Sequence, residues 1–232
     1  MRTENEEIRD HLKYLSLLAR DYPSQAAAAS EIISTQALLK LPKGTEHFMS
    51  DLHGENEAFV HILNSASGVI REKVDLLFEE QLNDSERQAI CTLIYYPKEK
   101  LEQLKKENAL SMERYRMILN QLIEIAKLLS SKYTRSKVRK AMPEDFAYII
   151  DELLHVQKDE DDNQVRYHQK ILDTILEIDN ADEFIVALAE LIKRLAVDHL
   201  HIVGDIFDRG PYADKIMDLL MNYHSLDFEW GN

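Results

Sequence analysis

A helical pattern of apolar residues runs almost unbroken from about Val69 to Leu195, and no convincing strand interrupts it. A short strand is predicted on each side of this stretch, over Glu46–Asp51 and over His199–Gly204, and a third over Leu226–Trp230. The first crossover is about 130 residues longer than a simple strand-to-strand connection needs. The order of elements therefore predicts a helix-rich α/β fold, with a parallel sheet and a large all-helical insertion.

Composition agrees with this fold and excludes several classes of protein. Only 6 Gly and 5 Pro occur among 232 residues, which disfavours an all-β fold full of tight turns. The balance of 28 Lys+Arg against 42 Asp+Glu gives a net charge of −14, so neither nucleic acid nor an anionic membrane is an expected partner. A single Cys allows no internal disulfide, and no apolar run approaches the roughly 20 residues that span a bilayer. With an N-terminus too acidic for a signal peptide, the predicted location is the cytoplasm.

Three divisions of the chain are predicted: N-terminal helices with the first strand (1–66), the helical insertion (67–196), and the second and third strands (197–232). Several helix boundaries are predicted from capping residues. They are an N-cap at Ser24 for a helix reaching Leu41, a cap at Asp84 or Ser85, Pro143 in a first turn, a capping box of Asn180 and Glu183, and a helix over Tyr212–Tyr223. The run from Asp159 to Asn163 is predicted as an acidic connection between helices.

Three short motifs follow the three predicted strands. They are Asp51-Leu52-His53-Gly54-Glu55, Gly204-Asp205-Ile206-Phe207-Asp208-Arg209-Gly210 and Trp230-Gly231-Asn232. Ligands of open α/β sheets bind outside the carboxyl ends of the strands. We therefore expect all three motifs to face one crevice, although Asp51 and Asp205 are 205 − 51 = 154 residues apart.

The residue types in these motifs suit divalent cations and phosphate. Asp51, His53, Asp205 and Asn232 offer carboxylate, imidazole and amide ligands, a mixture that favours Mn, Fe or Zn over Ca. Two ions could activate a water and stabilise an in-line displacement at phosphorus. Arg209 offers a planar fork for phosphate. The alternative for each motif alone is structural: Asp-x-His is common in capped turns, and Gly-rich turns often carry N-capping Asp.

Other residues that bear reactive groups are assigned to structural roles. His199 and His201 share one strand face, but His199 lies roughly 20 Å from Asp205, at about 3.3 Å per residue. His47 has the same position at the start of the first strand. Cys91 falls in a helical apolar pattern and is expected in the core.

The ordered set of motifs resembles that of the calcineurin-like metallophosphoesterases. The long helical insertion, flanked by Asp-Leu-His-Gly-Glu and Gly-Asp-Ile-Phe-Asp-Arg-Gly-Pro, resembles in particular the class III fructose-1,6-bisphosphatases of bacteria. This resemblance implies hydrolysis of fructose 1,6-bisphosphate to fructose 6-phosphate and phosphate in gluconeogenesis, with manganese as the ion of a dinuclear site. It implies Asp51, His53 and a bridging Asp205 at the first metal, and Asn232 at the second. It also implies Arg209 on the phosphate and Asp208 orienting a ligand.

The resemblance stops at the end of the chain, because the family continues with a His after Asn232 and with further His ligands. On that ground the sequence is expected to be an N-terminal fragment, inactive alone and prone to self-association through the strand that begins at Leu226. Two other functions stay open. The motifs specify metal and phosphate but not the alcohol, so a phosphoprotein or nucleotide phosphatase fits them too. A non-catalytic helical interaction module is the third possibility.

Overall fold

The computed structural model describes residues 4–156, 162–229 and 231, and it divides into two compact units. The first unit, residues 1–42, contains α1 (Glu4–Asp21) and α2 (Gln25–Leu38). The hydroxyl of Ser24 accepts a hydrogen bond from the Ala27 amide at 3.1 Å, which confirms the predicted N-cap. No residue of α2 is buried within the described chain, and Ile32 and Ile33 are among its exposed apolar side chains.

The second unit, residues 43–232, contains a parallel sheet of three described strands in the order β1-β2-β3. These are β1 (Glu46–Met49), β2 (His199–Val203) and β3 (Leu226–Glu229). The register pairs Glu46 with His199 and Leu200 with Leu226. All three predicted strands are confirmed, and β1 and β2 end slightly before the predicted Asp51 and Gly204. Trp230, the last residue predicted for the third strand, lies outside the described residues.

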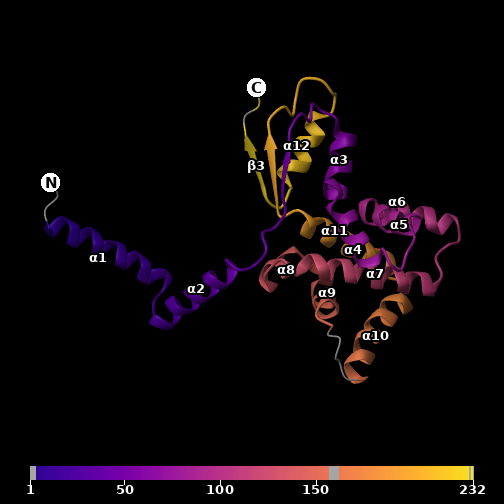
Figure 1. Ribbon diagram of the computed structural model, residues 1–232, viewed down its shortest axis with the longest axis horizontal. Coiled ribbons are helices and arrows are strands. Elements are labelled where there is room, and N and C mark those ends of the chain that lie inside the picture. Colours follow the sequence, from indigo (N-terminus) through magenta and orange to yellow (C-terminus); the bar gives the residue numbers. More distant parts are fainter. Residues whose placement is uncertain (1–3, 157–161, 230, 232) are drawn as a thin grey trace. The chain divides into compact units, whose positions relative to one another are not determined.

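One face of the sheet packs against α3 (Asn56–Ser65) and α12 (Ala213–Met221) (Figure 1). Leu200 and Ile202 point to this face and are fully buried together with Phe59 of α3 and Ile216 of α12. The two helices follow the first and second motifs, and α12 falls within the helix predicted over Tyr212–Tyr223. We call this group of buried residues, which extends to both motif loops, the sheet core.

The described part of the long connection between β1 and β2 consists of helices joined by turns and loops and contains no strand, as predicted. A larger hydrophobic cluster, the insertion core, fills it from Ala66 to Val197. Its central helices, α7 and α11, pack together, and Tyr115 of α7 donates a hydrogen bond to Asp182 of α11 at 2.8 Å. Cys91 is buried in this core, as expected. The helices are α4 (Val69–Phe78), α5 (Asp84–Tyr95), α6 (Pro97–Lys106), α7 (Met112–Ser130), α8 (Arg135–Ala141), α9 (Ala147–Leu154), α10 (Asp162–Glu177) and α11 (Ala181–Ala196), with 3-10 turns η1 (Ala66–Gly68) and η2 (Glu144–Phe146).

Several predicted helix ends are wrong in detail. The cap of α5 is Asn83, not Asp84 or Ser85, because Asn83 and Glu86 bond to each other's backbone amides at 3.0 and 2.9 Å. Asn180 precedes α11, but its ψ of 17° is not the extended conformation of a capping residue, and its side chain caps nothing.

The remaining differences concern where segments begin and end. Pro143 precedes the turn η2 and is not in the first turn of a helix. Helix α2 ends at Leu38, three residues before the predicted Leu41. The acidic connection falls mostly outside the described residues, and α10 already begins at Asp162.

Candidate metal centre

The loops after β1 and β2 lie side by side because their strands are neighbours in the sheet. Pairing continues past the strand ends through the backbone: the His53 amide donates to the Asp205 carbonyl and the Gly54 amide to the Ile206 carbonyl, both at 2.8 Å. The Gly210 amide then donates to the His53 carbonyl at 2.5 Å. Asp51 and Asp205 are separated by 154 positions in the sequence, but they follow adjacent strands, which brings the first two motifs together as predicted.

Two glycines make this close approach possible. Gly54 has a φ of +70°, and a Cβ there would fall on the carbonyl oxygen of Gly210. A Cβ on Gly210 would lie 2.6 Å from the His53 carbonyl oxygen. No side chain fits at either position while the loops stay in contact.

Asp51, His53 and Asp205 converge at the strand ends, and we call them the Asp51 cluster. Each offers one ligand atom, and these atoms all lie within 4.8 Å of one another. The His53 Nε2 is 3.5 Å from the Asp51 Oδ1. This mixture of two carboxylates and one imidazole fits a divalent transition metal. The structure thus brings together three of the four predicted metal ligands.

The backbone at this cluster is held in an unfavourable conformation. Asp51, His53 and Asp205 have φ values of 56°, 44° and 54°, and Asp208 has 91°. Residues other than glycine seldom adopt such angles, although Asp and His do so more often than most. Strain of this kind persists where the surrounding structure enforces it and is concentrated at functional sites. Here the cross-loop backbone hydrogen bonds provide that enforcement.

His53 is oriented through its Nδ1 atom. That atom lies 2.6 Å from the Asp208 Oδ1 and 3.2 Å from the Phe207 carbonyl oxygen, so Nδ1–H donates to both acceptors. The lone pair of Nε2 is then directed to the side of Asp51 and Asp205, as in a carboxylate–histidine–metal arrangement. The Phe207 carbonyl and then the Asp208 carboxylate raise the pKa of His53.

Asp51 is supported by its neighbours in the same way. The Ser50 hydroxyl donates to its Oδ2 at 2.6 Å and, as the largest cause, lowers the pKa of Asp51. The charges of His53 and Arg209 lower it further. Arg209 itself is exposed and makes no hydrogen bond or ion pair with the described residues. Its guanidinium is therefore available to an anion at the cluster.

Asn232, the fourth predicted ligand, lies outside the described residues. The residue before it, Gly231, is described, and a Cβ there would lie 2.6 Å from both the amide nitrogen and the Oδ1 of Asp205. The chain after β3 therefore passes directly against the second motif. This proximity agrees with the expectation that the third motif faces the same crevice.

The sequence motifs do not predict two of these supporting groups, the Ser50 hydroxyl and the Phe207 carbonyl. Ser50 could have been noticed, because a hydroxyl beside a candidate ligand is a common hydrogen-bond donor to it. The group at Phe207 is a backbone carbonyl. Every residue has one, so the sequence does not indicate which carbonyl contacts His53.

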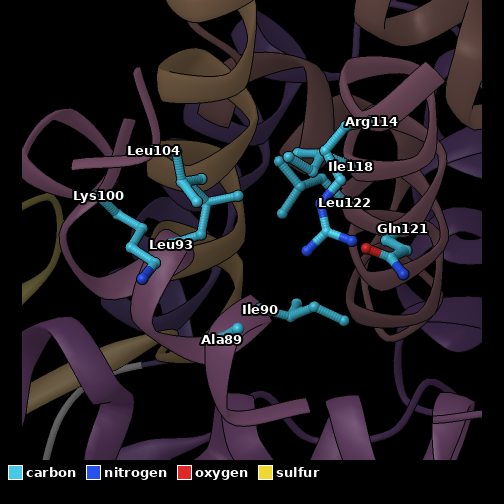
Figure 2. A pocket seen from close by; sticks show the side chains of 9 residues that line it. All are labelled: Ala89, Ile90, Leu93, Lys100, Leu104, Arg114, Ile118, Gln121 and Leu122. Carbon is cyan, nitrogen blue, oxygen red and sulfur yellow. The ribbon is translucent and has the colours of Figure 1, made fainter. Parts of the chain in front are cut away.

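A small pocket lies elsewhere, between α5, α6 and α7 of the insertion (Figure 2). Its volume is about 80 Å³ and its walls are mainly aliphatic. Figure 2 shows Arg114 and Gln121 on one side of it and Lys100 on the other. None of its lining residues belongs to the Asp51 cluster, so this pocket is separate from the candidate metal centre. Among the helices that the structure describes, none is long and apolar enough to cross a bilayer.

Comparison with known proteins identifies close relatives. A family model described as Firmicute fructose-1,6-bisphosphatase matches residues 13–232. A protein of Clostridium acetobutylicum named fructose-1,6-bisphosphatase class 3 is 56% identical over 230 residues, which are 99% of this chain and 34% of that protein. A protein of the same name from Listeria innocua is 56% identical over 221 residues, 95% of this chain and again 34% of the relative. The chain thus spans about a third of the length of these relatives. No solved structure matches it significantly.

Proposed function

This chain belongs to the Firmicute fructose-1,6-bisphosphatase family, and we propose on that premise that it carries part of a metal-dependent phosphatase site. The proposed reaction is hydrolysis of fructose 1,6-bisphosphate to fructose 6-phosphate and phosphate. The observation that carries this proposal is the Asp51 cluster, in which ligands from two distant motifs lie within 4.8 Å of one another. The three-stranded parallel sheet behind it supports a calcineurin-like core.

In this proposal Asp51, His53 and Asp205 hold a divalent cation, and Asn232 contributes to a second one. When bound, such a pair of ions supplies Lewis-acid stabilisation of the phosphoryl oxygens and lowers the pKa of water. Asp208 holds the imidazole of His53 with Nδ1 protonated, so that Nε2 stays available as a ligand. Ser50 holds the Asp51 carboxylate through its other oxygen.

Arg209 is the proposed phosphate contact. It is exposed, lies close enough to influence the pKa values of Asp51 and His53, and is not engaged by the described residues. A guanidinium donates two parallel hydrogen bonds to a phosphate and cannot ligate a cation. Asp208 and Arg209 are therefore neighbours with different tasks: one positions a ligand and the other binds substrate.

The finer assignments belong to the same proposal. Manganese is the proposed ion, gluconeogenesis the proposed process and the cytoplasm the proposed location, with a homo-oligomer as a possible assembly. The division into 1–66, 67–196 and 197–232 is also proposed. It is supported by two separate hydrophobic clusters, one in the insertion and one under the sheet.

The experiment grafts residues 1–232 onto the Clostridium acetobutylicum relative in place of the matching third of that protein. Phosphate release is measured with manganese from fructose 1,6-bisphosphate, from a nucleotide monophosphate and from a phosphopeptide. We expect turnover of the sugar bisphosphate that Asp205→Ala reduces to less than a tenth, because both metals depend on this carboxylate in the proposed site.

The unaltered relative and an Asp214→Asn graft serve as controls, since Asp214 is an exposed carboxylate in the first turn of α12. Preference for the nucleotide or the phosphopeptide would replace the proposed substrate and keep the metal site. Full activity of Asp205→Ala, with metals bound, would remove Asp205 from the site.

A further inference from the structure

A second group of ligating side chains lies on the face of the sheet opposite α3 and α12. His199 and His201 are two residues apart on β2, so both point to this face, and Asp227 is paired with His201 on β3. The three residues, which we call the His199 cluster, each offer one ligand atom within 4.8 Å of the others. The Asp227 carboxylate lies between the two rings: its Oδ2 is 3.1 Å from the His199 Nε2, and its Oδ1 is 2.7 Å from the His201 Nδ1.

Each ring is also held from outside the cluster. The His199 Nδ1 lies 2.6 Å from the Ser225 hydroxyl. With Nδ1–H donating to that hydroxyl, the lone pair of Nε2 faces Asp227. The ring of His201 stacks on Phe48 with centroids 4.2 Å apart and an angle of 9° between the planes. Its Nε2 is buried and has no partner among the described residues, so it does not fix which nitrogen of His201 carries the proton.

These distances suit an ion between the three groups. Four ligands at about 2.0–2.2 Å around a tetrahedral Zn²⁺ lie roughly 3.3 Å apart from one another. The nitrogen–oxygen distances of 2.7 and 3.1 Å are hydrogen-bond distances, and they must lengthen by about 0.6 and 0.2 Å to reach that spacing. The side chains of His199, His201 and Asp227 are 31%, 19% and 53% exposed, so an ion can reach them and keep a water ligand.

We propose that His199, His201 and Asp227 form a second divalent-metal site, selective for Zn²⁺ and similar late first-row ions. Such ions prefer a ligand set of two imidazoles and one carboxylate, whereas Ca²⁺ and Mg²⁺ prefer oxygen ligands. Ser225 is a positioning residue that orients His199. Binding ties β2 to β3 through the ion.

This site is independent of the Asp51 cluster. His199 is at the start of β2 and Asp205 follows its end, so roughly 20 Å of strand separates them at about 3.3 Å per residue. The inference therefore does not rest on the proposed phosphatase function.

The test uses the 232-residue chain with Asp51→Asn and His53→Gln, which remove the first cluster. After chelator treatment, Zn²⁺ binding is measured by titration calorimetry and Co²⁺ binding by visible absorption. We expect one ion per chain. His199→Gln and Asp227→Asn should each weaken binding at least about 100-fold, and Ser225→Ala about 10- to 100-fold, the usual effect of losing a partner of a ligand. His11→Gln, at an exposed position of α1, should change nothing.

His199→Cys keeps the proposal falsifiable if the other variants unfold. A thiolate is also a ligand of these ions, so this variant should still bind Co²⁺ and add a sulfur-to-cobalt band in the near ultraviolet. The proposal is overturned if the background chain binds no stoichiometric ion, or if binding survives in His199→Gln and Asp227→Asn. It is also overturned if these variants lower thermal stability equally with and without Zn²⁺, because the cluster would then be a hydrogen-bonded link between strands.

Discussion

The contact between Asp208 and His53 joins an exposed carboxylate to a ring that is 12% exposed, and it decides which nitrogen of His53 can bind metal. In Asp208→Asn the side chain keeps its size but loses its charge, so the Nδ1 proton is held less firmly. We predict a 10- to 100-fold loss of manganese affinity, about the effect of changing such an outer partner. Calorimetric titration of the grafted enzyme measures it. The exposed Asp214→Asn is the matched control, and an equal loss there would assign the effect to overall charge.

Arg209 should act on the substrate and not on the metal. Arg209→Ala is predicted to leave manganese content near normal and to lower kcat/KM about 10- to 1,000-fold, at roughly 1.4 kcal/mol per decade. The reason is that a guanidinium binds phosphate but never a cation. Metal analysis and steady-state kinetics on the same preparation separate the two effects. Parallel loss of metal and activity would make the role of Arg209 structural.

At this scale the sequence predicts ligand types better than their orientation. Asp51, His53 and Asp205 were predictable because Asp-x-His and Gly-Asp-x-x-Asp-Arg-Gly each follow a strand end. The Phe207 carbonyl that fixes His53 was not, since backbone groups carry no residue-specific signal. The metal roles of these residues, and of Asn232, stay predictions. His199 and His201 illustrate the opposite case: their spacing was visible, but Asp227 joins them only through the register of β3.

Among the elements, the paired loops depend on Gly54. Gly54→Ala is predicted to separate the loops and to weaken metal binding by more than tenfold, because the added Cβ meets the Gly210 carbonyl. Gly68→Ala is a matched control, since Gly68 also has a positive φ, +93°, but no described atom lies within 4 Å of its Cβ position. That variant should cost only the backbone strain of about 1–2 kcal/mol. Urea unfolding and metal titration of both variants check the prediction, and equal effects on metal binding would contradict it.

His47, in β1, makes the free energy of unfolding depend on pH. Burial lowers the pKa of its imidazole, and its Nδ1 is buried without a partner among the described residues. The unfolded chain therefore takes up the proton first, and the contribution of neutral His47 to stability is lost as pH falls below about 6.5. We predict that wild-type chain loses more unfolding free energy between pH 7.5 and 5.5 than His47→Gln does. Urea titrations at both pH values measure this, with His11→Gln as control. Parallel curves for wild type and His47→Gln would contradict it.

The helix caps show why element boundaries are harder to predict than elements. Three successive residues, Asn83, Asp84 and Ser85, all favour an N-cap position. Ser85 also has a suitable partner, Gln88, three residues later, but Ser85 lies inside α5. Asn83 has the extended ψ of 169° that puts its side chain in place, and Glu86 returns the hydrogen bond. At Asn180 the same pair of residue types is present, but the backbone before α11 is not extended. The ψ angle of Asn180 is set by tertiary packing and cannot be predicted from the local sequence.

For the whole molecule, the sheet and the insertion could be predicted because their periodicities differ. The helical spacing between Val69 and Leu195 and the short strands around it follow from which faces must be buried. The boundary predicted between residues 196 and 197 stays a prediction, and it lies close to where the two cores meet. Leu195 to Val197 belong to the insertion core while Leu200 belongs to the sheet core, so the division falls within a few residues between α11 and β2.

The two hydrophobic cores should open separately, and two buried phenylalanines test this. Phe59 of α3 is 1% exposed in the sheet core, and Phe184 of α11 is fully buried in the insertion core. Truncation of either to Ala should cost about 3–5 kcal/mol by loss of apolar burial and creation of a cavity. Because the sheet core is the smaller, Phe59→Ala should unfold it while the insertion stays folded.

Amide hydrogen exchange in Phe59→Ala should then become fast at Leu200 and Ile202 but stay slow at Leu119 and Leu122. Phe184→Ala should accelerate exchange in α7 and α11 first. Uniform acceleration in both regions by either variant would show that residues 43–232 unfold as one cooperative unit.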